Sequence, residues 1–207
     1  TKGGGDYDEI RGGMTYSWSW GSVGLLKDHF VWGDNYHGSN IFSGHQPSFT
    51  HLKFHMSPVK WFDFNYVHGW LVSDVIDSSR SYYNGNSIRI VFQPKYVAAN
   101  MFTFTPLQNW SFSVGNSVIY SDQSVNPAYL MPFFFYKSVD HSLTSSGSNF
   151  LGQNSQLYFN LSTRAVKKTH LYISAFIDEL ALGRALDSEK HTNFVSLKAG
   201  GRVSNIL

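Results

Sequence analysis

Apolar and polar residues alternate along most of this 207-residue chain. In Met14–Gly21, for example, Met14, Tyr16 and Trp18 alternate with threonine and serine. A repeat of two residues places one set of side chains on each face of a β-strand. The same alternation recurs in six further segments: Thr50–Met56, Lys60–Trp70, Ser87–Tyr96, Asn109–Tyr120, Leu157–Ala165 and Asn193–Val203. The sequence therefore predicts an all-β protein of about ten strands. A short helical turn is expected only in Glu179–Lys190.

The composition of the two strand faces indicates which face meets water. The apolar faces carry tryptophan and tyrosine near the strand ends: Trp18, Trp20, Trp61, Trp70, Trp110, Tyr120 and Tyr136. The opposite faces carry serine, asparagine, glycine, lysine and arginine. Aromatic girdles, a lipid-facing apolar band and a polar interior are typical of transmembrane barrels. Because a backbone in lipid must pair all its polar groups, such strands close into a barrel. We therefore expect an antiparallel transmembrane β-barrel, with Phe62, Phe64 and Phe112 facing lipid.

The segments between the strands differ in length in a regular way. Short joins are expected at Ser57-Pro58, Thr105–Asn109 and Ala165–Thr169, on the periplasmic side. Longer polar segments, expected to be extracellular, are residues 33–48, 73–86, 121–127, 138–155 and 179–192. Short connections on one side and long ones on the other are characteristic of outer-membrane barrels. We expect residues 1–207 to form one barrel domain, truncated at both ends and part of a larger barrel, in the cell outer membrane.

The composition excludes several classes of protein. The chain has no cysteine, so disulfide frameworks, thiolate metal sites and cysteine nucleophiles are excluded. Its net charge of +2 is too small to indicate nucleic-acid binding. The nine histidines do not form a convincing metal site. His51 and His55, four residues apart, would lie roughly 13 Å apart along one face of a strand.

A hydrolase is also disfavoured. The segment around Ser43 lacks the Gly-x-Ser-x-Gly pattern of a nucleophile elbow, since Asn40 and Ile41 precede Phe42. That elbow also needs a strand, a turn and a helix in succession, which this chain does not offer. We therefore expect no catalytic residues, no metal site, no cofactor and no enzymatic activity.

The order of several short motifs resembles a known family. The first, in Phe30–Lys53, contains Trp32-Gly33, Tyr36-x-Gly38-Ser39 and Pro47-Ser48-Phe49. Further on, Gly115–Tyr120 is followed by Tyr129–Tyr136, then by Asn149 before a strand, and by Ala175–Glu179. This succession, over about Gly21 to Glu179, resembles the Wzi-like outer-membrane β-barrels, especially the Bacteroidota branch with its capsule-assembly and gliding-associated members.

The resemblance implies a function and a set of partners. It implies residence in the outer membrane, in contact with lipid and lipopolysaccharide. For capsule members it implies attachment of polysaccharide at the cell surface, without catalysis. Other outer-membrane or secretion-machine proteins are further expected partners, and nucleic acid is not. The chain could instead serve a surface machine for gliding or secretion. Two other hypotheses remain open, a porin-like channel and a soluble β-sandwich lectin.

Two groups of residues are candidates for ligand binding. A polar and aromatic loop is the candidate sugar site: Asp34, Asn35, Tyr36, His37 and Asn40. Amides and acids bind sugar hydroxyls, and aromatic rings stack on sugar faces. We expect residues 34–46 to form an outward loop, with Tyr82–Asn86 as a second loop of this kind. A basic set is expected in the lumen: Lys53, Arg89, Lys95 and Arg164, with Lys198 and Arg202 on the same pattern.

Overall fold

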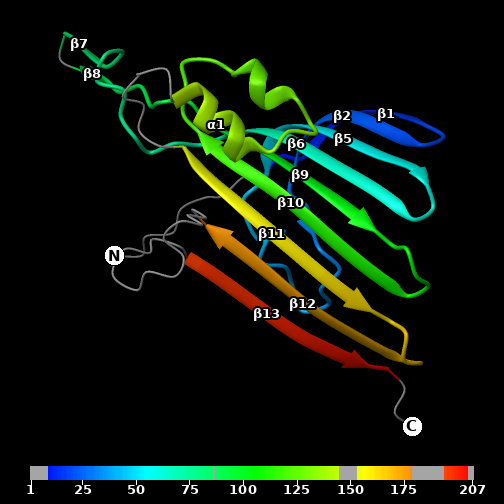
Figure 1. Ribbon diagram of the computed structural model, residues 1–207. Coiled ribbons are helices and arrows are strands. Elements are labelled where there is room, and N and C mark those ends of the chain that lie inside the picture. Colours follow the sequence, from blue (N-terminus) through cyan, green and yellow to red (C-terminus); the bar gives the residue numbers. More distant parts are fainter. Residues whose placement is uncertain (1–8, 86, 145–152, 179–193, 205–207) are drawn as a thin grey trace.

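The computed structural model describes residues 9–85, 87–144, 153–178 and 194–204. Its main feature is one antiparallel sheet of nine strands, in which each strand lies beside the next along the chain (Figure 1). The strands are β1 (Gly12–Trp18), β2 (Gly21–Asp28), β5 (Phe49–Val59), β6 (Phe62–Leu71), β9 (Lys95–Phe104), β10 (Trp110–Tyr120), β11 (Asn154–Thr163), β12 (Thr169–Asp178) and β13 (Phe194–Val203). The prediction of an all-β, antiparallel fold is confirmed.

Six short elements lie in the longer connections. Two hairpins are formed by β3 (Val31–Trp32) with β4 (Phe42–Ser43), and by β7 (Tyr82–Asn84) with β8 (Ser87–Arg89). The 3-10 helix η1 (Pro127–Leu130) and the helix α1 (Tyr136–Thr144) lie between β10 and β11. No helix in the described ranges is long and apolar enough to cross a membrane.

The connections are short at one edge of the sheet and long at the other. The short ones are residues 19–20, 60–61, 105–109 and 164–168, and the long ones are 29–48, 72–94, 121–153 and 179–193. Figure 1 shows the short turns along the right side and the β7–β8 hairpin and helix α1 of the long connections at the upper left. Strands β1 and β13 lie at the two ends of the sheet, and within the described residues they do not pair with each other.

The two faces of the sheet have opposite chemistry, and the usual relation between chemistry and burial is reversed. The face that carries Ser113, Asn160 and Ser174 is called the polar face, because the register places these residues side by side across β10, β11 and β12. On it, Asn160 is 3% and Ser174 is 2% exposed. On the opposite, apolar face, Tyr16 is 71% and Leu197 is 72% exposed. Strands β11 and β12 therefore bury polar side chains and present apolar ones.

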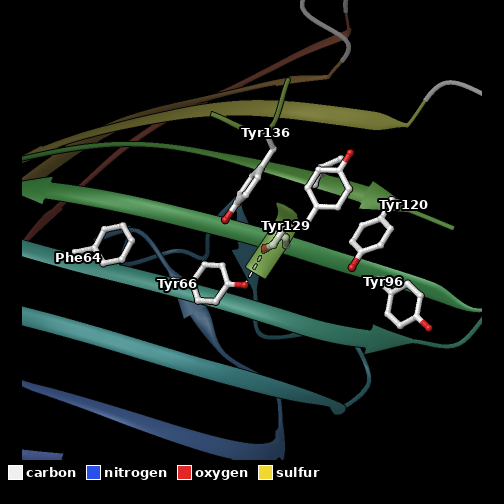
Figure 2. Packing of buried hydrophobic residues seen from close by; sticks show 8 residues of the cluster. Phe64, Tyr66, Tyr96, Tyr120, Tyr129 and Tyr136 are labelled. Atoms are coloured by element: carbon white, nitrogen blue, oxygen red, sulfur yellow. Dashed lines mark hydrogen bonds between the residues drawn. The ribbon is translucent and has the colours of Figure 1, made fainter. Parts of the chain in front are cut away.

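One part of the apolar face is covered by the segment 121–144, which contains η1 and α1. Tyr129 and Tyr136 of this segment are fully buried against aromatic residues of the sheet (Figure 2). The Tyr66 hydroxyl of β6 donates a hydrogen bond of 2.9 Å to the Tyr129 carbonyl. Phe133 stacks on Phe64 with ring centroids 4.6 Å apart. The prediction that Phe64 faces lipid is therefore wrong, because this segment covers it. An interfacial position for Tyr136 is also wrong, because its side chain is fully buried between the segment and the sheet.

Two asparagines hold the segment 121–144 on the apolar face. Nδ2 of Asn100 donates to the carbonyl oxygens of Pro132, at 2.8 Å, and Phe134, at 2.9 Å. Oδ1 of Asn116 accepts a hydrogen bond of 2.9 Å from the backbone N–H of Tyr136. Because a buried backbone group without a partner is costly, these two side chains fix the position of the segment.

Several boundaries differ from the sequence-based expectation. Ser87–Tyr96 is not one strand of the sheet, because its first residues form the short strand β8 and its last two begin β9. Ser57-Pro58 lies inside β5, where the register with β6 shifts between Met56 and Val59, and the turn follows at residues 60–61. The helical turn expected in Glu179–Lys190 lies outside the described residues.

Candidate functional site

Residues 29–48 connect β2 to β5 and are here called the inner loop. They lie over the polar face of the sheet. Trp32 anchors them, since it is 5% exposed and packs in one cluster with Met101 of β9 and Tyr158 of β11. Gly33 follows with a φ of +102°, a backbone conformation that glycine adopts readily. A side chain at this position would also meet the Asn160 amide. The turn after Trp32 thus directs the loop along β11 and β12.

The side-chain amides of Asn35 and Asn40 in the inner loop form hydrogen bonds with the sheet. Nδ2 of Asn35 donates to Oγ of Ser174 at 3.0 Å, and Oδ1 of Asn35 accepts from Nδ2 of Asn160 at 3.0 Å. Oδ1 of Asn40 accepts from Oγ of Ser174 at 2.7 Å, and Nδ2 of Asn40 donates to the Ser196 carbonyl at 3.1 Å. Asn35 is 8% exposed. These groups hold the loop in place and are not presented to a ligand.

Asp34 makes the strongest contact between the inner loop and the sheet. Its carboxylate accepts hydrogen bonds from both terminal nitrogens of Arg164, one of them at 2.7 Å, and from Oγ of Ser162 at 2.8 Å. Burial raises the pKa of the Asp34 carboxyl, but the hydrogen bonds from Arg164 and Ser162 lower it by more. The net result is a pKa below the ordinary value of 3.8. The carboxyl is therefore ionised and paired at neutral pH.

The middle of the inner loop reaches β12 and β13. The Arg202 guanidinium lies over the Tyr36 ring, 3.9 Å from its centroid. Nζ of Lys198 donates to the His37 carbonyl at 2.8 Å, and the His37 N–H donates to the Tyr172 hydroxyl at 3.3 Å. The Tyr36 and His37 side chains themselves are exposed.

A pocket rich in positive charge lies where the inner loop meets the short-turn edge. Its volume is about 290 Å³, and it is called the basic pocket. Its lining consists of Tyr36, Arg164, Lys168, Thr169, His170, Arg202 and Ser204. The pairing of β12 with β13 sets His170 opposite Arg202, and Thr163, which precedes Arg164, pairs with Leu171. Three basic side chains, Arg164, His170 and Arg202, therefore lie in one row across the ends of β11, β12 and β13.

A second, larger cavity lies at the other end of the inner loop, beside the long-connection edge. Its volume is about 560 Å³. It is lined mainly by apolar side chains, which include Ile41, Phe42, Phe49, Val97 and Ile119. Its polar groups come from the loop, at Ser39, Asn40, Ser43, Gln46 and Ser48.

The structure corrects the predicted position of the candidate sugar site. All five candidates, Asp34, Asn35, Tyr36, His37 and Asn40, belong to the inner loop. This loop lies on the polar face and does not project outward. Ser39, expected at the loop surface, is 7% exposed, and its Oγ accepts from the Ile41 N–H at 3.0 Å. The loop folds inward because its amides and Asp34 find partners on three strands.

The structure places three members of the predicted basic set on the polar face and the fourth elsewhere. Lys53 in β5 and Lys95 in β9 lie on the polar face by register, and Arg164 follows β11 on that face. Arg89 does not belong there, because it lies in the separate β7–β8 hairpin. His170 was not part of the prediction. The signal that could have found it is the alternation of β12, in which positions 170, 172 and 174 share a face.

The remaining candidate chemistry is sparse. In the described ranges, no three histidine, aspartate or glutamate side chains are placed to hold a metal ion. Oγ of Ser43 accepts a hydrogen bond of 3.3 Å from the His45 N–H, which is a local turn contact.

Comparison of the chain with protein-family models, curated proteins and solved structures finds no match.

Proposed function

We propose that the nine-stranded sheet is the wall of an outer-membrane β-barrel, with its apolar face toward lipid and its polar face toward the lumen. The reversed burial carries this proposal. A large exposed apolar face on a sheet calls for a covering, and lipid provides one over the whole height of the strands. The same observation weighs against a soluble lectin, whose sheets would bury their apolar faces against each other.

The inner loop closes the lumen in this proposal, which weighs against a porin-like channel. Asp34, Asn35 and Asn40 bind side chains or backbone of β11, β12 and β13 across the polar face. A loop held in this way leaves less space for water and solutes. We expect low conductance in planar bilayers, and higher conductance when residues 34–46 are replaced by a short glycine-serine linker. High conductance of the unaltered protein would favour the channel.

The proposed role is the attachment of surface polysaccharide without catalysis, as the Wzi-like resemblance implies. Because the inner loop is turned inward, the β7–β8 hairpin is the better candidate for sugar contact. Figure 1 shows it standing clear of the nine-stranded sheet, on the long-connection side. Tyr82 is 51% and Tyr83 is 79% exposed. Nη1 of Arg89 donates to the Tyr82 hydroxyl at 3.2 Å. Two aromatic rings beside a cation suit an acidic or neutral sugar.

Replacement of Tyr82 and Tyr83 by alanine tests this role in cells. Stacking of a ring on a sugar contributes on the order of 1 kcal/mol, by analogy with aromatic pairs, so retention of polysaccharide should weaken severalfold. Barrel abundance should not change, because neither ring packs in the core. The matched control replaces Tyr36 and His37 by alanine, which should affect retention less.

Deletion of the whole gene is the stronger test. Loss of the polysaccharide layer supports attachment. An intact layer, with loss of secretion, adhesion or gliding, would contradict it and would make the protein a component of a surface machine.

A further inference from the structure

Arg164, His170 and Arg202, here called the basic row, carry more positive charge than the inner loop neutralises. In the described part of the chain, Asp34 is the one carboxylate within ion-pair distance of the row. Asp34 accepts hydrogen bonds from Arg164, while its Oδ2 lies 3.7 Å from Nε2 of His170. Arg164 and Arg202 carry two fixed positive charges against the one negative charge of Asp34, so the row favours an additional anion.

Two members of the row have hydrogen-bonding capacity that the described residues do not use. Nε2 of His170 is buried and has no hydrogen-bond partner among the described residues. In the same part of the chain Arg202 has no carboxylate partner, and its guanidinium lies over the Tyr36 ring. An aromatic face holds a guanidinium in place without using its N–H groups, which can still donate hydrogen bonds. Both side chains line the basic pocket.

We propose that the basic pocket is a binding site for an oxyanion, a phosphate or a carboxylate group. Arg202 and His170 would donate to it, and the hydroxyls of Thr169 and Ser204 line the same volume of about 290 Å³. The planar fork of an arginine matches the geometry of both groups. Asp34 holds Arg164 and repels the bound anion, so it limits the affinity. The pocket lies at the short-turn edge, opposite to the β7–β8 hairpin, and this inference is independent of polysaccharide attachment there.

Calorimetric titration of the full chain, refolded in zwitterionic lipid vesicles, tests the site. One arm uses inorganic phosphate at constant ionic strength, and the other uses polygalacturonate, with neutral dextran as its control. Arg202→Gln should lower the affinity roughly tenfold, the loss expected for a hydrogen bond to a charged group. Asp34→Asn should raise the affinity. Lys167→Gln, in the same turn but outside the pocket, should leave the affinity unchanged.

Each result decides the proposal. Saturable binding of phosphate alone identifies a site for a free oxyanion, and binding of the polyuronate identifies an acidic glycan. The proposal is overturned if neither binds, if Lys167→Gln costs as much as Arg202→Gln, or if Asp34→Asn does not raise the affinity. Circular dichroism of each variant verifies folding, and the opposite signs expected for positions 202 and 34 distinguish the site from a general loss of structure.

Discussion

Tyr158 of β11 lies flat across Gly115 of β10, so closely that a β-carbon at position 115 would overlap its ring. The Tyr158 hydroxyl donates to the carbonyl oxygens of Asn100, at 2.7 Å, and Asn116, at 3.0 Å. A glycine in a strand often marks such a close approach. The flat ring leaves space above the polar face, and Trp32 of the inner loop packs there. The centroid of the Trp32 ring lies 6.3 Å from that of the Tyr158 ring. The glycine thus makes room for the loop that covers the sheet.

Gly115→Ala should therefore destabilise the protein by about 1–3 kcal/mol, the usual cost of overpacking. The Tyr158 ring and the neighbouring backbone would both have to move. Gly12→Ala in β1 is the matched control, because an added β-carbon there has nothing within 4 Å. Urea unfolding in lipid vesicles measures both changes. Equal stability of the two variants would show that the close approach does not matter.

Asn100→Ala should release the segment 121–144 from the apolar face. The change leaves the partly buried Pro132 carbonyl without its donor and leaves the Phe134 carbonyl with only the longer bond, of 3.4 Å, from Nδ2 of Asn116. The expected cost is about 1–3 kcal/mol, the usual penalty for one carbonyl left without a partner. Limited proteolysis should cut this segment faster than in the unaltered protein, while the strands remain protected. Unchanged cleavage would argue against the role of Asn100.

The stabilising effect of Asp34 should depend on pH. Its folded pKa lies below the ordinary value of 3.8, so its contribution is complete above about pH 5 and disappears as the pH falls through the folded pKa. At pH 7, Asp34→Asn should cost on the order of 1 kcal/mol, because the pair is partly exposed. The unfolding free energies of the two proteins, compared from pH 7 to pH 3, check this. A difference that grows toward low pH would contradict the assignment.

Leu197→Arg should destabilise the protein in lipid far more than Ser196→Arg. Both residues are exposed and lie next to each other in β13, on opposite faces of the sheet. An arginine on the lipid face near the bilayer midplane costs about 2–4 kcal/mol, whereas a lumen position accepts it. Folding titrations into vesicles measure the two penalties. Equal penalties would remove the assignment of the faces.

The alternation of residues predicted the all-β class, six strands of the sheet with their two faces (β1, β5, β6, β10, β11 and β13) and the edge that carries the long connections. These features depend on local periodicity. The alternating segments did not include β2, β9 or β12, and β9 itself carries consecutive buried residues. The same pattern failed at Phe64, because its covering residue, Phe133, lies in a segment with no strand periodicity. The asparagines at positions 100 and 116 are the signal for that segment, since each places an amide on an otherwise apolar face.

The candidate site was harder to predict, because its contacts join residues far apart in the chain. Asp34 and Arg164 are 130 residues apart in sequence. Each is also an ordinary loop residue when considered alone. The inward fold of the inner loop depends on the register of three strands, which places Asn160 beside Ser174 and sets Ser196 opposite Phe176, two residues further along β12. A polar segment between strands otherwise predicts an outward loop, as it does for the β7–β8 hairpin.

The central claim is that the apolar face meets lipid and the polar face meets the lumen. Spin labels on single cysteines in β1 test it most directly, because the chain has no native cysteine and both faces of β1 are exposed. In lipid vesicles, labels at Met14 and Tyr16 should collide mainly with oxygen, and labels at Thr15 and Ser17 mainly with a water-soluble nickel chelate. Equal accessibility at all four positions, or the opposite alternation, would contradict the claim.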